Sequence, residues 1–228
     1  MKEKTINRWS YSRLGTYESC PKKAYYRYIK KVPEEQHPAA ESGIKIHNLA
    51  EQYIKGEIEE VPRELYLFYE GFEQLKEGYN DGEVSVEEQW AFNLSWEKTD
   101  WDGEDTWGRY IIDAFVKQGN YAKVIDFKTG RFKDNNEGYK KQCSLYASCV
   151  LKRFPELEKI DAELWYLDHH KITRFHFERD ELIEAKEKFH KRAISMTTDT
   201  EFKTTPSEFA CRFCSFTNIC KDNFYERS

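Results

Sequence analysis

The sequence predicts one α/β domain in which helices pack around a small mixed sheet. The apolar spacing is helical near the start, changes to alternation after residue 84, and is helical again in two later segments. The resulting order is helices, three strands, a helix, two strands, a helix and a short tail. This order fits helices packed around a mixed sheet. No linker divides the chain, so we expect a single domain over residues 1–228.

Residues 1–80 are predicted to form a helical cap. Ser10 or Ser12 caps a first helix that runs to about residue 31, where Pro33 ends it. A second helix covers residues 43–56, and a third covers residues 62–77.

Residues 84–196 are predicted to form the sheet and its helices, and residues 202–228 a cysteine-rich tail. The predicted strands cover residues 84–98, 110–117, 122–128, 160–168 and 171–177. A turn at Gly119 and Asn120 joins the second strand to the third. Helices are predicted over residues 136–153 and from a cap at Asp180 to Met196.

The composition indicates a folded, water-soluble protein. Hydrophobic residues make up 39% and charged residues 34% of the chain, and no apolar run is long enough to cross a bilayer. No signal peptide follows the charged start, so we expect a cytoplasmic protein without a membrane partner. The net charge of −5 argues against indiscriminate coating of nucleic acid, although local basic segments remain available for phosphates.

Two predicted strands bring acids and a lysine together. Asp126 and Lys128 lie two residues apart at the end of one strand, so their side chains share a face. Asp113 ends the preceding apolar strand and reaches the same place if the two form a hairpin. A single carboxylate in an apolar strand is costly unless it has a partner such as a metal ion.

This set suits phosphodiester hydrolysis with one or two Mg²⁺ or Mn²⁺ ions. Such ions prefer carboxylate and carbonyl oxygens, here Asp113, Asp126 and the backbone carbonyl of Phe127. Lys128 would orient the attacking water or stabilise charge on the phosphate. The alternative is an ordinary strand end, because an Asp-x-Lys turn on its own is common.

Six cysteines are distributed unevenly. Cys211, Cys214 and Cys220 crowd the tail, Cys20 stands alone near the start, and two more lie in a predicted helix. A disulfide framework does not suit a cytoplasmic chain. A thiolate site for an iron–sulfur cluster or zinc remains open, as does a purely structural role.

The motifs resemble those of the RecB-like branch of the PD-(D/E)XK nucleases, which includes CRISPR-adaptation nucleases and AddB-type nucleases. The resemblance implies a restriction-endonuclease-like core and assigns family roles to seven residues. They are a metal-binding histidine at His47, the acids Asp113 and Asp126, Lys128, the helix pair Gln142 and Tyr146, and a further metal-binding acid at Glu88, with neighbouring Glu87 as the alternative.

The same resemblance implies a [4Fe–4S] cluster held by Cys20, Cys211, Cys214 and Cys220, with structural Zn²⁺ as the second choice. It also implies an exonuclease that acts on single-stranded DNA or on DNA ends. The alternatives are a catalytically idle DNA-binding or assembly subunit and an RNA-directed hydrolase. Recombination or CRISPR proteins, or further copies of the chain, are the protein partners that the resemblance suggests.

Basic residues near tyrosines are the candidates for nucleic-acid binding. Lys22, Lys23 and Arg27 are interleaved with tyrosines in the first helix, a pattern typical of single-strand channels. Arg131 and Lys141 flank the acid–lysine segment. The alternative for the tyrosines is packing of the helical cap against the sheet.

Overall fold

The computed structural model describes residues 5–34, 38–132 and 137–226. Its centre, in these described ranges, is a six-stranded mixed sheet in the order β2-β1-β3-β4-β5-β6, in which β4 and β5 pair in parallel and the other neighbours pair antiparallel. The strands are β1 (Val84–Phe92), β2 (Lys98–Thr99), β3 (Gly108–Gln118), β4 (Tyr121–Lys128), β5 (Lys159–Tyr166) and β6 (Lys171–Glu178). The predicted α/β architecture is confirmed.

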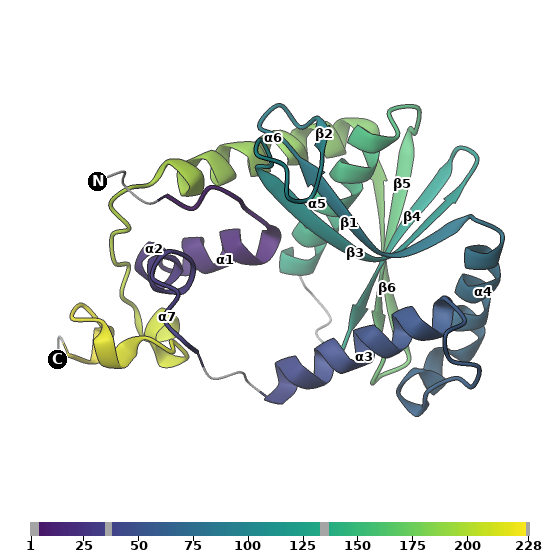
Figure 1. Cartoon of the computed structure of the whole chain (residues 1–228), viewed down its shortest axis with the longest axis horizontal. Helices are drawn as coiled ribbons and strands as arrows, with labels where there is room; N and C mark the ends of the chain where they lie inside the picture. The colour runs from purple at the N-terminus through teal and green to yellow at the C-terminus, as the bar shows by residue number, and fades with distance from the viewer. Residues whose placement is uncertain (1–4, 35–37, 133–136, 227–228) are drawn as a thin grey trace.

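Helices cover both faces of the sheet (Figure 1). The α-helices are α1 (Tyr11–Ser19), α2 (Pro21–Ala24), α3 (Pro38–Ile54), α4 (Tyr69–Asn80), α5 (Glu137–Arg153), α6 (Arg179–Thr198) and α7 (Glu208–Arg212). The 3-10 and π segments are η1 (Tyr25–Ile29), η2 (Arg63–Phe68), η3 (Thr217–Ile219) and η4 (Phe224–Glu226). In the described ranges, no helix is long and apolar enough to span a membrane.

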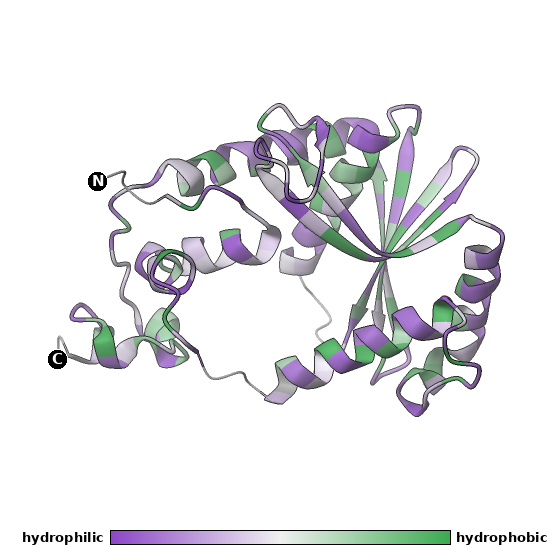
Figure 2. Cartoon of the chain, in the orientation of Figure 1, coloured by the Kyte–Doolittle hydropathy of each residue, from purple (hydrophilic) through white to green (hydrophobic). Residues whose placement is uncertain are grey.

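Two hydrophobic cores lie on opposite faces of the sheet. One core joins α1, α5 and α6 to the strands, and the other joins α3, η2 and α4 to them. Figure 2 shows hydrophobic residues spread along the strands, whereas α4 is mainly hydrophilic on the side shown. Burial of these apolar faces is the main stabilising contribution to the fold.

The first predicted helix is interrupted, which corrects its expected extent to residue 31. Ser10 caps α1 by accepting a hydrogen bond from the N–H of Arg13 at 3.3 Å, as predicted. Cys20 is extended, and Pro21 begins α2. Proline disfavours a helical conformation in the residue before it, so the chain must bend at Cys20.

The first predicted strand is also shorter than expected, because β1 ends at Phe92. The side chain of Asn93 accepts hydrogen bonds from the N–H groups of Ser95 and Glu97, both at 3.0 Å. This turn reverses the chain into β2. The apolar alternation up to residue 96 therefore crosses a turn, and Trp96 is buried from a left-handed backbone position.

The second predicted helix begins earlier than expected, at Pro38, and the third begins as the 3-10 segment η2 before α4. The later elements follow the predictions, with one change at a cap. The turn at Gly119 joins β3 to β4 as expected. The predicted helix start at Asn136 lies outside the described residues. Glu178, and not Asp180, caps α6, and Glu181 completes a reciprocal capping box.

Candidate active site

Strands β3 and β4 stop pairing with each other at the candidate site. Their pairing ends at Ala114 and Ile125, whereas β4 continues to pair with β5 as far as Lys128. Asp113 is therefore the first residue of β3 beyond the pairing and lies at the middle of that strand, not at its end as the sequence suggested. The N–H of Phe127, freed from β3, donates a hydrogen bond to Asp113 Oδ2 at 2.7 Å.

In both β1 and β3, the face of the strand that points into each hydrophobic core changes partway along, and the change occurs at paired positions in the two strands. In β1, Val86 packs in the core beside α3 and α4, but Trp90 packs in the opposite core. In β3, Ile112 and Ala114 divide between the two cores in the same way. Regular strands keep residues of equal parity on one face, so both strands rotate here. The rotation separates β3 from β4 and creates room for polar side chains.

Glu87 lies where β1 changes faces, and its carboxylate, not that of the predicted Glu88, approaches His47. The register pairs Val86 with Ala114 and Glu88 with Ile112, so Glu87 lies level with Asp113. Glu87 has a left-handed backbone (φ 50°), which is strained for a residue with a side chain. Its carboxylate lies beside His47, whereas that of Glu88 accepts a hydrogen bond from its neighbour Trp90 at 2.9 Å. No local pattern in the sequence distinguishes these two adjacent acids.

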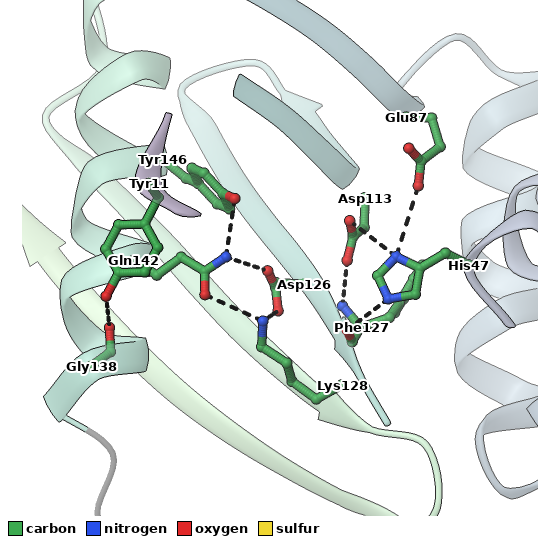
Figure 3. Close-up of polar contacts among 10 residues, drawn as sticks. All are labelled: Tyr11, His47, Glu87, Asp113, Asp126, Phe127, Lys128, Gly138, Gln142 and Tyr146. Atoms are coloured by element: carbon green, nitrogen blue, oxygen red, sulfur yellow. Dashed lines mark hydrogen bonds and ion pairs between the residues drawn. The ribbon is translucent and has the colours of Figure 1, made fainter. Parts of the chain in front are cut away.

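Helix α3 carries His47, and the ring of this histidine lies beside the carboxylates of Asp113 and Glu87 (Figure 3). Its Nε2 lies 3.0 Å from the carbonyl oxygen of Phe127 and, facing an acceptor, carries the proton. Its Nδ1 lies 3.4 Å from Asp113 Oδ1 and 3.9 Å from Glu87 Oε1. Ligand atoms of these three side chains lie within 4.8 Å of one another. A nitrogen and two carboxylates form a donor set that suits a divalent ion.

The local charges perturb two of these groups. Burial, and next the negative charge of Asp113, raise the pKa of Glu87 to about 7. Burial acts to lower the pKa of His47, but its interactions with Asp113, Asp126 and Glu87 outweigh burial and raise it. The three carboxylates thus shift the histidine toward its cationic form more strongly than burial opposes it. A site that attracts protons this strongly also attracts metal cations.

Asp126 belongs to a second group of side chains on the other side of the opening (Figure 3). Its Oδ2 forms a short ion pair with the ammonium of Lys128, and its Oδ1 accepts a hydrogen bond from Gln142 Nε2 at 3.2 Å. The Gln142 amide also donates to Tyr146 Oη at 3.0 Å, and its Oε1 accepts from Lys128 at 3.3 Å. Spacing of four residues on α5 puts Gln142 and Tyr146 on one helix face.

The lysine of this group remains protonated. Burial acts to lower the pKa of Lys128, but the charge of Asp126 and its hydrogen bond raise it above the ordinary value. Burial raises the pKa of Asp126 to about 6, against the opposing effect of Lys128. The ammonium of Lys128 also lies 4.7 Å from the centre of the Tyr139 ring. Lys128 therefore presents a fixed positive charge at the opening.

Both groups line one open pocket of about 1010 Å³. His47, Glu87 and Asp113 line it together with Asp126 and Lys128. The pocket thus combines a candidate set of metal-ligand atoms with a separate lysine, whereas the carboxylate of Asp126 pairs with Lys128 and is not grouped with the histidine.

The four predicted cluster cysteines line one separate cavity. Cys20 comes from the bend before α2, and Cys211, Cys214 and Cys220 come from the tail. Their sulfur atoms do not form a compact ligand group: among the described residues, three ligand atoms within 4.8 Å of one another occur only at His47, Glu87 and Asp113. The two remaining cysteines are buried in α5, as expected for small apolar residues.

The predicted nucleic-acid contacts are scattered. Lys22 and Lys23 line the cysteine cavity, away from the active-site pocket. Arg27 is held by Glu34 through two hydrogen bonds of 2.5 Å. Arg131 is exposed and follows β4 in the sequence. Lys141 is also exposed and directly precedes Gln142. Both therefore lie close to active-site residues in the sequence.

The tyrosines of the first helices serve mainly in packing. Tyr17, Tyr25 and Tyr28 pack against the core beside α5 and α6. Tyr26 packs on Phe216 of the tail, with ring centres 5.5 Å apart. The packing alternative for these tyrosines therefore agrees with the structure.

The fold and the site together define a class of protein. A mixed sheet flanked by helices, with two acids and a lysine where adjacent strands part, is the arrangement of a restriction-endonuclease-like nuclease. The chain belongs to the PD-(D/E)XK nuclease superfamily, whose sequence profile matches residues 8–221.

One solved structure supports this fold, and another is similar over most of its length. A predicted exonuclease from Eubacterium rectale aligns with 94% of this chain and 90% of its own, at 15% identity and a TM-score of 0.54. The structure of SSO0001 aligns with 96% of this chain and 88% of its own, at 16% identity and a TM-score of 0.43. No curated protein matches the sequence significantly. At such identities the similarity concerns the fold alone.

Proposed function

We propose that this protein hydrolyses phosphodiester bonds in DNA with Mg²⁺ or Mn²⁺, as an exonuclease on single strands or DNA ends. The observation that carries the proposal is the opening between β3 and β4, where His47, Glu87 and Asp113 face a fixed lysine. Membership of the nuclease superfamily supports the reaction class. The fold shared with the predicted exonuclease from Eubacterium rectale is consistent with this class.

His47, Glu87 and Asp113 would hold the divalent ion, with the carbonyl of Phe127 beside them. When bound, such an ion neutralises phosphate charge and provides Lewis-acid chemistry. Lys128 would place its ammonium against the scissile phosphate and stabilise the charge that develops there. Gln142 would fix the positions of the Lys128 and Asp126 side chains, because its amide forms hydrogen bonds with both.

The test compares cleavage of labelled single- and double-stranded DNA and RNA with Mg²⁺ or Mn²⁺. We expect cleavage of single-stranded DNA, and its loss by at least about a hundredfold in Asp113→Asn and in Lys128→Ala. The exposed lysine Lys159 begins β5, at the opposite end of that strand from Tyr166, which pairs with Lys128, and it provides the matched control Lys159→Ala, which should cleave normally. Undiminished cleavage in both site variants would falsify the assignment, and a wild type that binds DNA without cutting it would favour an idle subunit.

We also propose that Cys20, Cys211, Cys214 and Cys220 hold a [4Fe–4S] cluster, with Zn²⁺ as the alternative. Their convergence on one cavity from opposite ends of the chain supports a shared ligand. Tetrahedral zinc requires sulfur atoms about 3.8 Å apart at bonds of about 2.3 Å. Among the described residues, no three of these sulfur atoms lie within 4.8 Å of one another, so the shared cavity and not the sulfur spacing supports the proposal.

Iron and zinc analysis of purified protein tests this second proposal. We expect brown protein that contains iron, and loss of that iron in Cys20→Ala. The buried Cys143 provides a control, because Cys143→Ala removes a thiol without touching the cavity. Colourless protein with stoichiometric zinc would select the alternative, and protein with neither metal would reject both.

A further inference from the structure

A second cavity adjoins the active-site pocket. Its volume is about 790 Å³, and its walls come from the segment before α1, the start of α1, the loop between β2 and β3, and β3 itself. Ile111, Gln142 and Tyr146 line both this cavity and the active-site pocket. The two are therefore neighbouring parts of one surface, and a chain that leaves the active site on this side enters the second cavity.

The second cavity has a positive lining. It contains Arg8, Arg13 and Arg109 and, within the part of the chain that the structure describes, no carboxylate, although the whole chain has a net charge of −5. The active-site pocket beside it is lined by Glu87, Asp113 and Asp126. In that pocket Lys128 offsets part of the negative charge, whereas the second cavity presents arginines, so an anionic ligand is attracted more strongly to the second cavity.

Two of the arginines converge on one anion. Arg109 Nη2 lies 2.5 Å from Asp102 Oδ1, and Arg8 Nη1 lies 3.8 Å from the same oxygen. Arg8 is also held by the carbonyl of Gly103 at 2.8 Å. The Asp102 side chain is 84% exposed and does not line the cavity. Guanidinium groups bind carboxylate and phosphate oxygens with the same geometry, so Arg8 and Arg109, which bind the Asp102 carboxylate outside the cavity lining, can bind a phosphate oxygen in its place.

An aromatic ring lies beside these arginines. Trp101 lines the cavity and is half-buried, and the Arg109 guanidinium lies 4.8 Å from its ring centre. Indole rings next to cationic side chains provide stacking platforms for unpaired bases. A base in a duplex is not available for such stacking, so this combination favours a single strand.

We infer that this cavity binds the single-stranded DNA that flanks the scissile phosphate. Arg8 and Arg109 contact its backbone, and Trp101 stacks on a base. Arg13 adds positive charge from α1, where it donates a hydrogen bond to the carbonyl of Arg8 at 3.1 Å. The inference rests on the proposed nuclease function, and it names a strand-binding surface away from the lysines of the first helices.

Binding of a fluorescent oligothymidylate, measured by anisotropy in EDTA over a range of salt concentrations, tests the inference. Arg8→Gln and Arg109→Gln should each weaken binding about fivefold and reduce the salt slope by about 0.7. Trp101→Ala should weaken it about tenfold with an unchanged slope. Arg63→Gln is the matched control, because Arg63 is an exposed arginine of η2 that does not line the cavity.

Asp102→Asn makes the test independent of folding defects, because it alters an exposed side chain and predicts the opposite sign. It should tighten binding about threefold, since the arginines lose a competing anion. Unchanged affinity in Asp102→Asn and in both arginine variants would overturn the inference. Tighter, arginine-dependent binding of an oligouridylate would overturn the choice of DNA. Binding in EDTA does not depend on cleavage, so failure of the catalytic assignment would be seen separately, as cleavage that survives Asp113→Asn.

Discussion

The N–H of Phe127 donates a hydrogen bond of 2.7 Å to the carboxylate of Asp113, where β3 and β4 cease to pair. A buried backbone donor that has lost its strand partner needs another acceptor, and Asp113 supplies it. The other carboxylate oxygen of Asp113 faces His47 at 3.4 Å. One side chain thus stabilises the opening between the strands and contributes to the candidate group of metal-ligand atoms within it.

Glu87 and Glu88 offer a matched pair of variants. Glu87→Gln should weaken Mn²⁺ binding, because it removes one of three grouped ligands. We expect a loss of at least about tenfold, the size typical of substitutions around metal ligands. Glu88→Gln should bind Mn²⁺ almost normally, since Glu88 contacts Trp90. Titration calorimetry measures both. Equal losses in the two variants would contradict the structural assignment of Glu87.

Metal binding should depend on pH near neutrality. The pKa of Glu87 is raised to about 7 and that of His47 is raised as well, and an ion binds only their deprotonated forms. Affinity for Mn²⁺ should therefore increase with pH through about 7, by roughly tenfold between pH 6 and 8 from Glu87 alone. In Glu87→Gln this increase should be smaller. A wild-type affinity that does not change over this range would refute the expectation.

The same shift predicts how Glu87 affects stability when no metal is added. Because its folded-state pKa lies above the ordinary value, ionisation of Glu87 disfavours the fold, and stability falls as pH rises through about 7. Glu87→Gln should remove this fall, so the variant gains stability relative to wild type at pH 8 but not at pH 4. Melting temperatures at the two pH values test this, and an equal difference at both would speak against it.

The left-handed backbone at Glu87 can be isolated from its charge. Glu87→Gly and Glu87→Ala both remove the carboxylate, but glycine adopts φ 50° without the steric cost that alanine meets. The glycine variant should be more stable than the alanine variant by about 1 kcal/mol in urea unfolding, and both should lose cleavage. If alanine proved the more stable, the strained conformation would be ruled out.

Gln142 should act as a positioning residue. Its amide contacts Asp126, Lys128 and Tyr146, so Gln142→Leu should lower the cleavage rate about tenfold or more and shift the pH profile of cleavage. Ser144→Ala, on the same helix and outside this network, is the control. A loss of melting temperature without a change in the pH profile would indicate a structural role only.

Parts of this protein could be predicted because their geometry is local. Two-residue spacing places Asp126 and Lys128 on one strand face, and four-residue spacing places Gln142 and Tyr146 on one helix face. Cys20 next to Pro21 contained the signal for the helix break, which the prediction of an unbroken helix overlooked.

The amino-acid sequence by itself determined the order of the elements and the side chains that could share a face, because period and turn chemistry act over a few residues. The tertiary structure alone decided that Glu87 and not Glu88 enters the site, because a backbone rotation shared by β1 and β3 sets that choice. It also brought Arg8 to Arg109 across nearly half of the chain. Contacts at that separation depend on how whole layers pack, and no local pattern encodes them.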